Sequence, residues 1–189
     1  MEDQELIRRI QNGQKEYLNE VAGKYYDDIY YFCSYQTGSR EDAYDLAQET
    51  FLRFIRYVDR YQYRNLKGYL LTIAMNLCRN YFRESGRTCL AEVYGGDSEI
   101  SYEEYARGNE GTAEGIGGME SMERSKLLAD ALLALPDMQR EVVLLHHFYG
   151  YKNREIARMT GASYAAVKSR IKQGLGKLRD LLDKEDFYG

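Results

Sequence analysis

The residues best suited to chemistry in this sequence form a basic helix near its C-terminus. The stretch YAAVKSRIKQGLGKL, residues 164–178, carries lysines and an arginine but no acidic residue, although the whole chain has a formal net charge of −4. Helical spacing places apolar side chains on one side of this stretch. The opposite side carries Ala165, Lys168, Ser169, Lys172 and Gln173. Because lysine donates to guanine and glutamine can bridge adenine's donor and acceptor, this side suits the major groove of DNA.

The segment before the basic helix supports that interpretation. KNREIARMTG is a short helical stretch that ends at Gly161, and Ser163 is a suitable N-cap for the next helix. A short helix, a glycine turn and a longer basic helix are typical of a helix-turn-helix. Arg154, Arg158 and Arg170 flank the basic face and suit phosphates, which supply affinity without sequence preference. The alternative is an ordinary solvated basic face.

A second basic region lies between residues 53 and 83, where seven arginines and lysines are opposed by Asp59 alone. Tyrosines and phenylalanines are interleaved with these charges. Positive charge with exposed aromatic rings suits single-stranded nucleic acid, because unpaired bases stack on the rings. We expect Tyr69 and Tyr81 to be core residues instead, whereas Tyr61 and Tyr63, in a predicted loop, are expected to be exposed.

An acidic and polar patch precedes this region. In DLAQETF, Asp45, Gln48 and Glu49 share one helix face at spacings i, i+3 and i+4. A patch of this charge should not face the same DNA as its basic neighbour. It is either a surface that contacts a protein or a solvated one.

The elements that position these residues are predicted to be helices throughout. The chain has a single proline, Pro136, and long stretches rich in helix-forming residues. We expect helices to end at Thr37, to restart after Ser39 and to run from about Leu66 to Phe82. The composition predicts no transmembrane helix or signal peptide, and we expect a cytoplasmic protein.

The chain divides into two predicted lobes. Residues 1–86 and 126–189 are the expected helical domains, and residues 87–125 are rich in glycine and acidic side chains, which indicates a flexible linker. The spacing of the three cysteines predicts neither a disulfide framework nor a zinc site, and the adjacent histidines lack further ligands. We therefore expect no catalytic, metal or cofactor site.

Three stretches together resemble a known family. SREDAYDLAQETFLRFIRYVDRY, LKGYLLTIAMNLCRNYFRE and LPDMQREVVLLHHFYGYKNREIARMTGASYAAVKSRIKQGLGKLRDLL resemble extracytoplasmic-function sigma factors of the bacterial sigma-70 family. The resemblance covers about residues 20–86 and 126–182, in the family's order. It implies an all-α fold in which the N-terminal lobe is sigma region 2 and the C-terminal lobe is sigma region 4.

The resemblance also implies partners and residue roles. Asp45, Gln48 and Glu49 would contact the clamp of core RNA polymerase, and apolar residues of the C-terminal lobe would contact its flap. A second set of residues would open the minus-ten promoter element and hold a flipped base of its non-template strand in a pocket. This set comprises Tyr61, Tyr63, Arg64, Asn65, Lys67, Asn76, Arg79, Asn80 and Arg83. Duplex DNA at the minus-thirty-five element would be read by Arg154, Tyr164, Ala165, Lys168, Ser169, Arg170, Lys172 and Gln173. An anti-sigma factor is a further implied partner.

The sequence departs from the family pattern at several positions. Tyr69 stands where tryptophan is usual, and the loop RYQYRN is short. Lys172 and Gln173 replace what is often an aromatic or small residue followed by arginine. The base preference of the family therefore cannot be carried over to this chain. We expect Gly174 and Gly176 to loosen the recognition helix. The acidic linker is expected to let the lobes close together and to shield their basic faces.

Two other functions compete with a sigma factor. The first is a stand-alone helix-turn-helix regulator, which would bind duplex DNA tightly and core polymerase not at all. The second is a nucleic-acid enzyme such as a recombinase, which would need a nucleophile or a carboxylate trio for metal ions.

Overall fold

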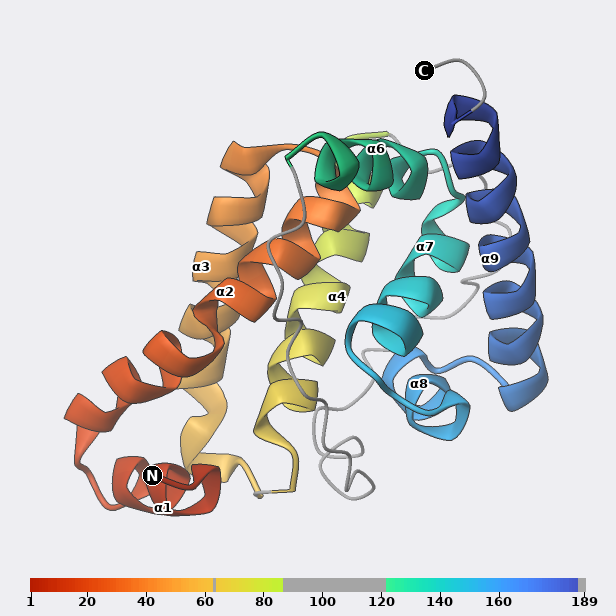
Figure 1. Ribbon diagram of the computed structural model, residues 1–189. Helices are drawn as coiled ribbons and strands as arrows, with labels where there is room; N and C mark the ends of the chain where they lie inside the picture. The colour runs from red at the N-terminus through yellow and green to blue at the C-terminus, as the bar shows by residue number, and fades with distance from the viewer. Residues whose placement is uncertain (63, 87–121, 187–189) are drawn as a thin grey trace.

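The computed structural model describes residues 1–62, 64–86 and 122–186, which contain helices and no strand (Figure 1). The all-α prediction is confirmed. The N-terminal lobe comprises α1 (Asp3–Gln11), α2 (Leu18–Thr37), α3 (Arg40–Tyr57) and α4 (Leu66–Glu84), with 3-10 turns at Lys15–Tyr17 and Val58–Arg60. The C-terminal lobe comprises α6 (Met122–Leu133), α7 (Asp137–Val143), a π-helical turn at Leu144–Phe148, α8 (Asn153–Thr160) and α9 (Tyr164–Asp186).

Helices α2, α3 and α4 pack together around the core of the N-terminal lobe. Their junctions follow the sequence signals. Gly38 has a φ of 70°, a left-handed conformation that glycine adopts without strain, and it ends α2 after Thr37. The Ser39 hydroxyl accepts a hydrogen bond of 3.2 Å from the backbone N–H of Asp42, which confirms the predicted N-cap of α3.

Helix α1 was not predicted, and it supports the loop between α3 and α4. Leu6, Ile7 and Ile10 are buried on the face of α1 that joins the core. At its end, the Gln11 amide donates to the carbonyl of Val58 at 2.8 Å and to that of Tyr61 at 2.7 Å. The Val58 carbonyl also accepts from the N–H of Tyr61, so the Gln11 amide adds to the bonding of the 3-10 turn and ties the start of the loop to α1.

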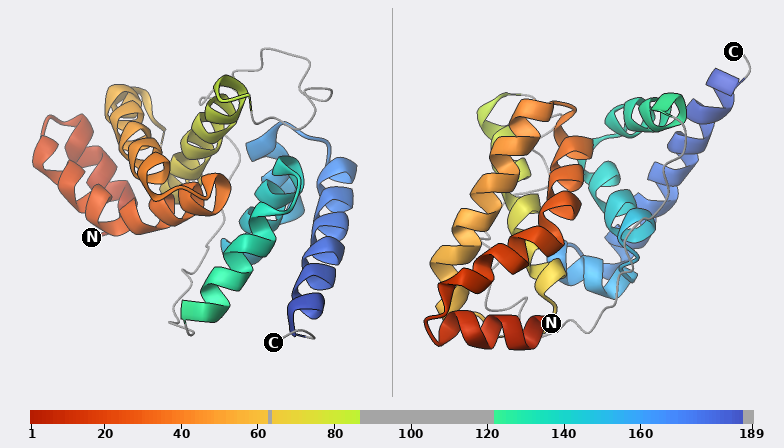
Figure 2. Two further views of the ribbon diagram at one scale, coloured as in Figure 1. Left: turned by 90° about the horizontal axis from the view of Figure 1, so that it is seen from above. Right: turned by 60° about the vertical axis from the view of Figure 1, so that its left-hand side comes forward.

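In the C-terminal lobe, α7 packs against α9, α6 contacts both of them, and α8 lies at the opposite end of α7 from α6 (Figure 2). Pro136 is the N-cap of α7. Helix α6 begins at Met122, inside the range predicted as linker. Residues 87–121, on which the rest of the linker prediction falls, lie outside the described part of the chain.

Gly174 has a role that differs from the predicted one. Helix α9 runs unbroken through both of its glycines. A Cβ atom at Gly174 would lie 2.8 Å from Cγ2 of Val143 and 3.3 Å from Cβ of Gln139, whereas a Cβ at Gly176 would meet nothing within 4 Å. Gly174 therefore permits the close approach of α7 and α9 rather than loosening the helix.

The two lobes touch each other. Helix α2 contacts α6 and α7, and α4 contacts α8. Among the helices described, none is long and apolar enough to span a membrane.

Candidate nucleic-acid and protein interfaces

Helices α8 and α9 form the predicted helix-turn-helix. Gly161, with a φ of 72°, makes the turn between them. The Ser163 hydroxyl accepts a hydrogen bond of 3.1 Å from the N–H of Ala166, so it caps the start of α9 as predicted. The two helices are held together by buried apolar side chains: Ile156, Met159, Val167 and Ile171.

The outer face of α9 is open and polar. Ala165, Lys168, Ser169, Lys172 and Gln173 are all exposed, and Tyr164 at its start is 51% exposed. The Gln173 carbonyl oxygen accepts a hydrogen bond from Gln139 of α7 at 3.1 Å, and its amide donates to Ser169 at 3.3 Å. These bonds hold the glutamine side chain between Gln139 and Ser169.

The flanking arginines are not equivalent. Arg154 and Arg158 are exposed, as phosphate contacts must be. Arg170 is half-buried, and its Nη1 atom is buried without a hydrogen-bond partner. Its guanidinium thus faces partly into the lobe rather than fully toward the open face.

In the loop before α4, Tyr61 is not exposed as expected, and Asn65 has a structural role. Tyr61, expected to be exposed, is 6% exposed and packs on Tyr69 with ring centroids 4.6 Å apart. The expectation failed because the loop packs against α1, a helix that was not predicted. Tyr63 lies outside the described residues. The Asn65 side chain accepts from the N–H of Gly68 at 2.9 Å and so caps α4, and Arg64 is exposed.

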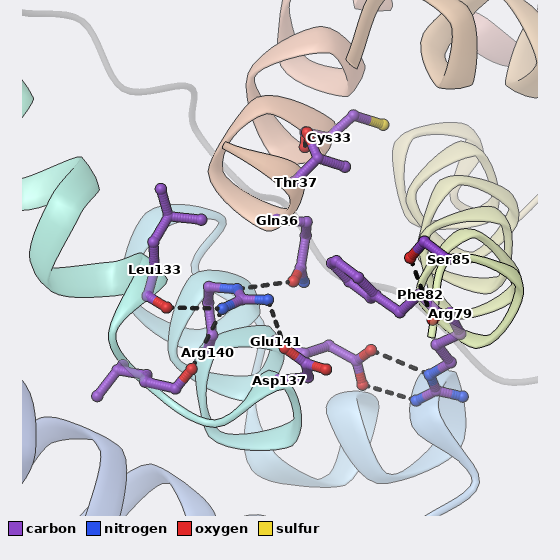
Figure 3. Close-up of polar contacts among 11 residues, drawn as sticks. Cys33, Gln36, Thr37, Arg79, Phe82, Ser85, Leu133, Asp137, Arg140 and Glu141 are labelled. Atoms are coloured by element: carbon purple, nitrogen blue, oxygen red, sulfur yellow. Dashed lines mark hydrogen bonds and ion pairs between the residues drawn. The ribbon is translucent and has the colours of Figure 1, made fainter. Parts of the chain in front are cut away.

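The predicted basic face of α4 is occupied in part by other side chains. Asn76 and Asn80 are half-buried, and Arg83 is exposed and donates to Asn80. Arg79, by contrast, forms a bidentate ion pair with Glu141 of α7, and Lys67 is buried beside Asp28 and Tyr149 (Figure 3 shows the Arg79 pair). Tyr69 is buried, as expected, whereas Tyr81 is half-buried and donates to Asp42 at 2.7 Å.

Helix α3 presents the third surface. Asp45 and Gln48 are exposed, and Glu49 is half-buried and paired with Arg53 at 3.0 Å. Sequence reasoning missed the apolar residues on the outside of this helix. Leu52 is 57% exposed and Ile55 42% exposed. Both lie outside the stripe of apolar residues that α3 buries. Apolar residues at helix positions outside the buried stripe are the sequence signal that could have predicted this exposed patch.

The described residues contain no cluster of three or more histidine, cysteine or acidic side chains that could hold a metal ion. Cys33 and Cys78 are buried thiols from α2 and α4. A hydrogen bond with Cys33, together with burial, raises the pKa of the Cys78 thiol well above its ordinary value. The thiol is therefore held protonated, which makes it a poor nucleophile.

Comparison with known proteins matches both lobes to one family. The family model for sigma-70 region 2 matches residues 21–88, and that for sigma-70 region 4 matches residues 125–178. The chain is 32% identical over 155 residues to the ECF RNA polymerase sigma factor EcfG of Rhodopseudomonas palustris, covering 80% of this chain and 78% of EcfG.

Two further matches agree with it. The chain is 31% identical over 180 residues to the ECF RNA polymerase sigma factor BldN of Streptomyces coelicolor, covering 94% of this chain but only 65% of BldN, so it spans less than two thirds of that relative. Among solved structures, the sigma factor RpoE from Bartonella quintana, in complex with the anti-sigma factor NepR, has a similar fold. The TM-score is 0.66 at 20% identity, covering 87% of this chain and 96% of RpoE.

Proposed function

This chain belongs to the extracytoplasmic-function sigma factors of the sigma-70 family, and on that premise we propose that it binds core RNA polymerase and directs it to promoters by reading two DNA elements. The observation that carries the proposal is that one chain holds three surfaces of different chemistry: the open face of α9, the basic face of α4, and the α3 surface formed by Asp45, Gln48, Glu49 and Leu52. A protein with a single ligand does not need three such surfaces.

The face of α9 is proposed to read the minus-thirty-five element as duplex DNA. Lys168, Lys172 and Gln173, which are all exposed on α9, would contact base edges in the major groove. Exposed Arg154 and the Tyr164 hydroxyl would contact phosphates at the ends of the site. The half-buried Arg170 would serve mainly to fix α9 against the lobe.

The loop and α4 are proposed to bind the melted minus-ten strand. Arg64 and Arg83 are exposed at the two ends of this surface and would track the strand's phosphates, with Arg79, Lys67, Asn76 and Asn80 between them. Asn65 and Tyr61 would contribute by shaping the loop, since one caps α4 and the other packs on Tyr69. A flipped base would meet this loop, at a cost of a few kcal/mol that stacking offsets.

The α3 surface is proposed to dock on the clamp of core polymerase. Leu52, an exposed apolar side chain beside Asp45 and Gln48, gives that surface an apolar centre with a polar margin, the usual anatomy of a protein interface. The enzyme supplies all the chemistry of RNA synthesis, so no catalytic group is proposed on this chain. An anti-sigma factor is a proposed second protein partner, and a protein with these partners would act in the cytoplasm.

A titration of fluorescently labelled protein against purified bacterial core RNA polymerase tests the proposal. We expect tight binding that the Gln48→Ala/Glu49→Lys double variant weakens at least ~10-fold, equivalent to about 1.4 kcal/mol. Glu20→Lys, which reverses an exposed charge elsewhere on the N-terminal lobe, is the control and should bind like the wild type. Absence of binding by the folded wild-type protein would instead favour the stand-alone regulator.

A further inference from the structure

Helix α1 ends beside the loop that is proposed to read the melted strand. Gln11 is the last residue of α1, and its amide nitrogen lies 2.8 Å from the carbonyl oxygen of Val58 and 2.7 Å from that of Tyr61. Val58 begins the 3-10 turn before the loop, and Tyr61 ends it. An amide nitrogen carries two hydrogens, so one side chain can donate to both carbonyls. Gln11 therefore ties both ends of this turn to α1.

Helix α1 is itself held firmly enough to act as a support. One face of it is buried in the core of the N-terminal lobe through three side chains: Leu6, Ile7 and Ile10. At the start of the helix, the Asp3 carboxylate accepts hydrogen bonds from Lys24 and from the Tyr25 hydroxyl, both on α2. Because α1 is fixed along its length, the Gln11 amide has a defined position relative to the core.

A second link between the same segments is weaker. Lys15, in the 3-10 turn after α1, pairs with Asp59 at 3.0 Å, but the two side chains are 49% and 66% exposed. An ion pair so open to water and salt contributes little. The Gln11 hydrogen bonds are neutral and partly buried, so salt does not screen them in this way. Gln11 is thus the main polar link between α1 and the loop.

The loop that follows is short and is fixed at both ends. At its far end, the Asn65 side chain caps α4. At its near end, the Tyr61 ring is buried and the Gln11 amide holds the Tyr61 carbonyl. Gln62 and Arg64 lie between these anchors with exposed side chains. An amide and a guanidinium at this place can meet the edge of an unpaired base and the phosphate beside it.

We propose that Gln11 is a positioning residue for base reading, which sets the path of the loop and so its preference among the bases of the melted strand. The inference rests on the proposed function of the loop. Gln11 acts through the Tyr61 carbonyl, and Gln62 and Arg64 follow the backbone that this carbonyl fixes. A site that reads bases needs its groups held to within about 0.5 Å, which a loop anchored at both ends provides better than a loop anchored at one.

Loss of this link should lower the preference for one base over another rather than binding in general. Without the Gln11 donors, the loop divides its time between the reading conformation and others, and only the reading conformation distinguishes bases. Arg83 on α4 is exposed outside the loop, so strands of any sequence keep its contact with phosphate. Because the Tyr61 ring stays packed on Tyr69, the loop is loosened rather than unfolded.

A role of Gln11 in stability alone would have a different effect. Destabilisation lowers the folded fraction, which multiplies every apparent dissociation constant by the same factor and leaves the ratios between bases unchanged. The ratio of affinities for two bases at one position therefore separates positioning from stability.

The test uses the holoenzyme formed by the full chain and purified bacterial core RNA polymerase. The probe is a pool of single-stranded DNA of randomised sequence and about 15 nucleotides, which offers the loop and α4 a strand but offers α9 no duplex. Strands retained by the holoenzyme are sequenced and compared with the input pool and with strands retained by core polymerase alone. The wild type should enrich a short motif.

Gln11→Met keeps the length of the side chain and removes its donors. We expect it to lower the preference for the favoured base by about threefold at one or more positions of the motif, as the loss of neutral hydrogen bonds allows. A homopolymer that lacks the motif should bind within about twofold of the wild type.

Two further variants isolate the donors. Gln11→Glu keeps the shape of the side chain but presents only acceptors to the two carbonyls, so it should also lower the preference by at least about threefold. Its added charge weakens all strands alike and leaves the ratios unaffected. Gln4→Met makes the same substitution at an exposed glutamine on the same helix and should change neither motif nor affinity.

Several outcomes would overturn the proposal. It fails if both Gln11 variants enrich the wild-type motif as strongly as the wild type, or if affinity falls by one factor for every strand. It also fails if only one of the two variants lowers the preference, or if Gln4→Met does so, since the Gln11 donors would then not be the cause. A wild-type holoenzyme that enriches no strand beyond core polymerase alone overturns it together with the assignment of the loop. Binding to core polymerase, measured by titration, reports separately on the sigma-factor proposal, so the failures are distinguishable.

Discussion

The close contact between α7 and α9 makes a quantitative prediction about two glycines in one helix. Gly174→Ala would place a Cβ 2.8 Å from the Cγ2 of Val143, well inside the normal carbon–carbon separation of about 3.5–4.0 Å. Val143 is fully buried and branched at Cβ, so its methyl cannot turn away easily. We expect the overpacking to cost about 1–3 kcal/mol in the free energy of unfolding.

Gly176→Ala is the matched control, because a Cβ there meets nothing within 4 Å. Each substitution also gains about 1 kcal/mol of helix propensity. That gain cancels when the two variants are compared, so their difference isolates the contact. Gly176→Ala should be more stable than the wild type, and Gly174→Ala should be less stable than Gly176→Ala by about 1–3 kcal/mol.

Urea denaturation followed by circular dichroism measures both variants. In thermal unfolding, the gap corresponds to about 2–4 °C for each kcal/mol in a chain of this size. Equal stability of the two variants would refute the reasoning, because it would mean that α7 does not press against α9 at Gly174.

Three other predictions concern the N-terminal lobe. Ser39→Ala should lower the free energy of unfolding, measured in urea, by about 1 kcal/mol, because the hydroxyl caps α3. Ser39→Asp should keep the wild-type stability, because aspartate is also a good N-cap. An unchanged stability of Ser39→Ala would contradict the role of the cap. Gln11→Ala should remove both hydrogen bonds from α1 to the loop, costing about 1–3 kcal/mol and speeding amide hydrogen exchange in residues 58–66; unchanged exchange would show that α1 does not hold the loop. In a Cys89→Ser variant, Cys33 and Cys78 should react with Ellman's reagent at pH 8 only after the protein is denatured. Both thiols are buried, and the raised pKa of Cys78 lowers the fraction of its reactive thiolate. Rapid labelling of the native protein would refute this prediction.

The sequence predicted the features that local signals specify. The end of α2 at Thr37, the cap at Ser39 and the turn at Gly161 depend on side chains within a few residues of them, so they could be predicted without knowing the tertiary structure. The open face of α9 followed from helical spacing alone.

The features that were missed depend on distant contacts. Tyr61 is buried because its loop packs against α1, a helix about 50 residues earlier in the chain, and no local pattern encodes that contact. From the sequence, Gly174 was expected only to loosen its helix, because the close approach of Val143 from α7 cannot be predicted from local signals. The contacts of Arg79 with Glu141 and of Lys67 with Tyr149 could not be predicted either, because they join segments on opposite sides of residues 87–121.

The most direct test of the central claim is transcription in vitro from fragmented bacterial DNA by core RNA polymerase, with and without this protein, followed by mapping of the RNA 5′ ends. The proposal predicts that adding the protein creates a defined set of 5′ ends, preceded by two shared sequence elements at a constant spacing. Gln48→Ala/Glu49→Lys should lose these ends because polymerase is no longer held, and Lys168→Ala/Lys172→Ala should weaken them because the upstream element is no longer read. A pattern of 5′ ends identical to that of core polymerase alone, with folded protein in excess, would contradict the sigma-factor account.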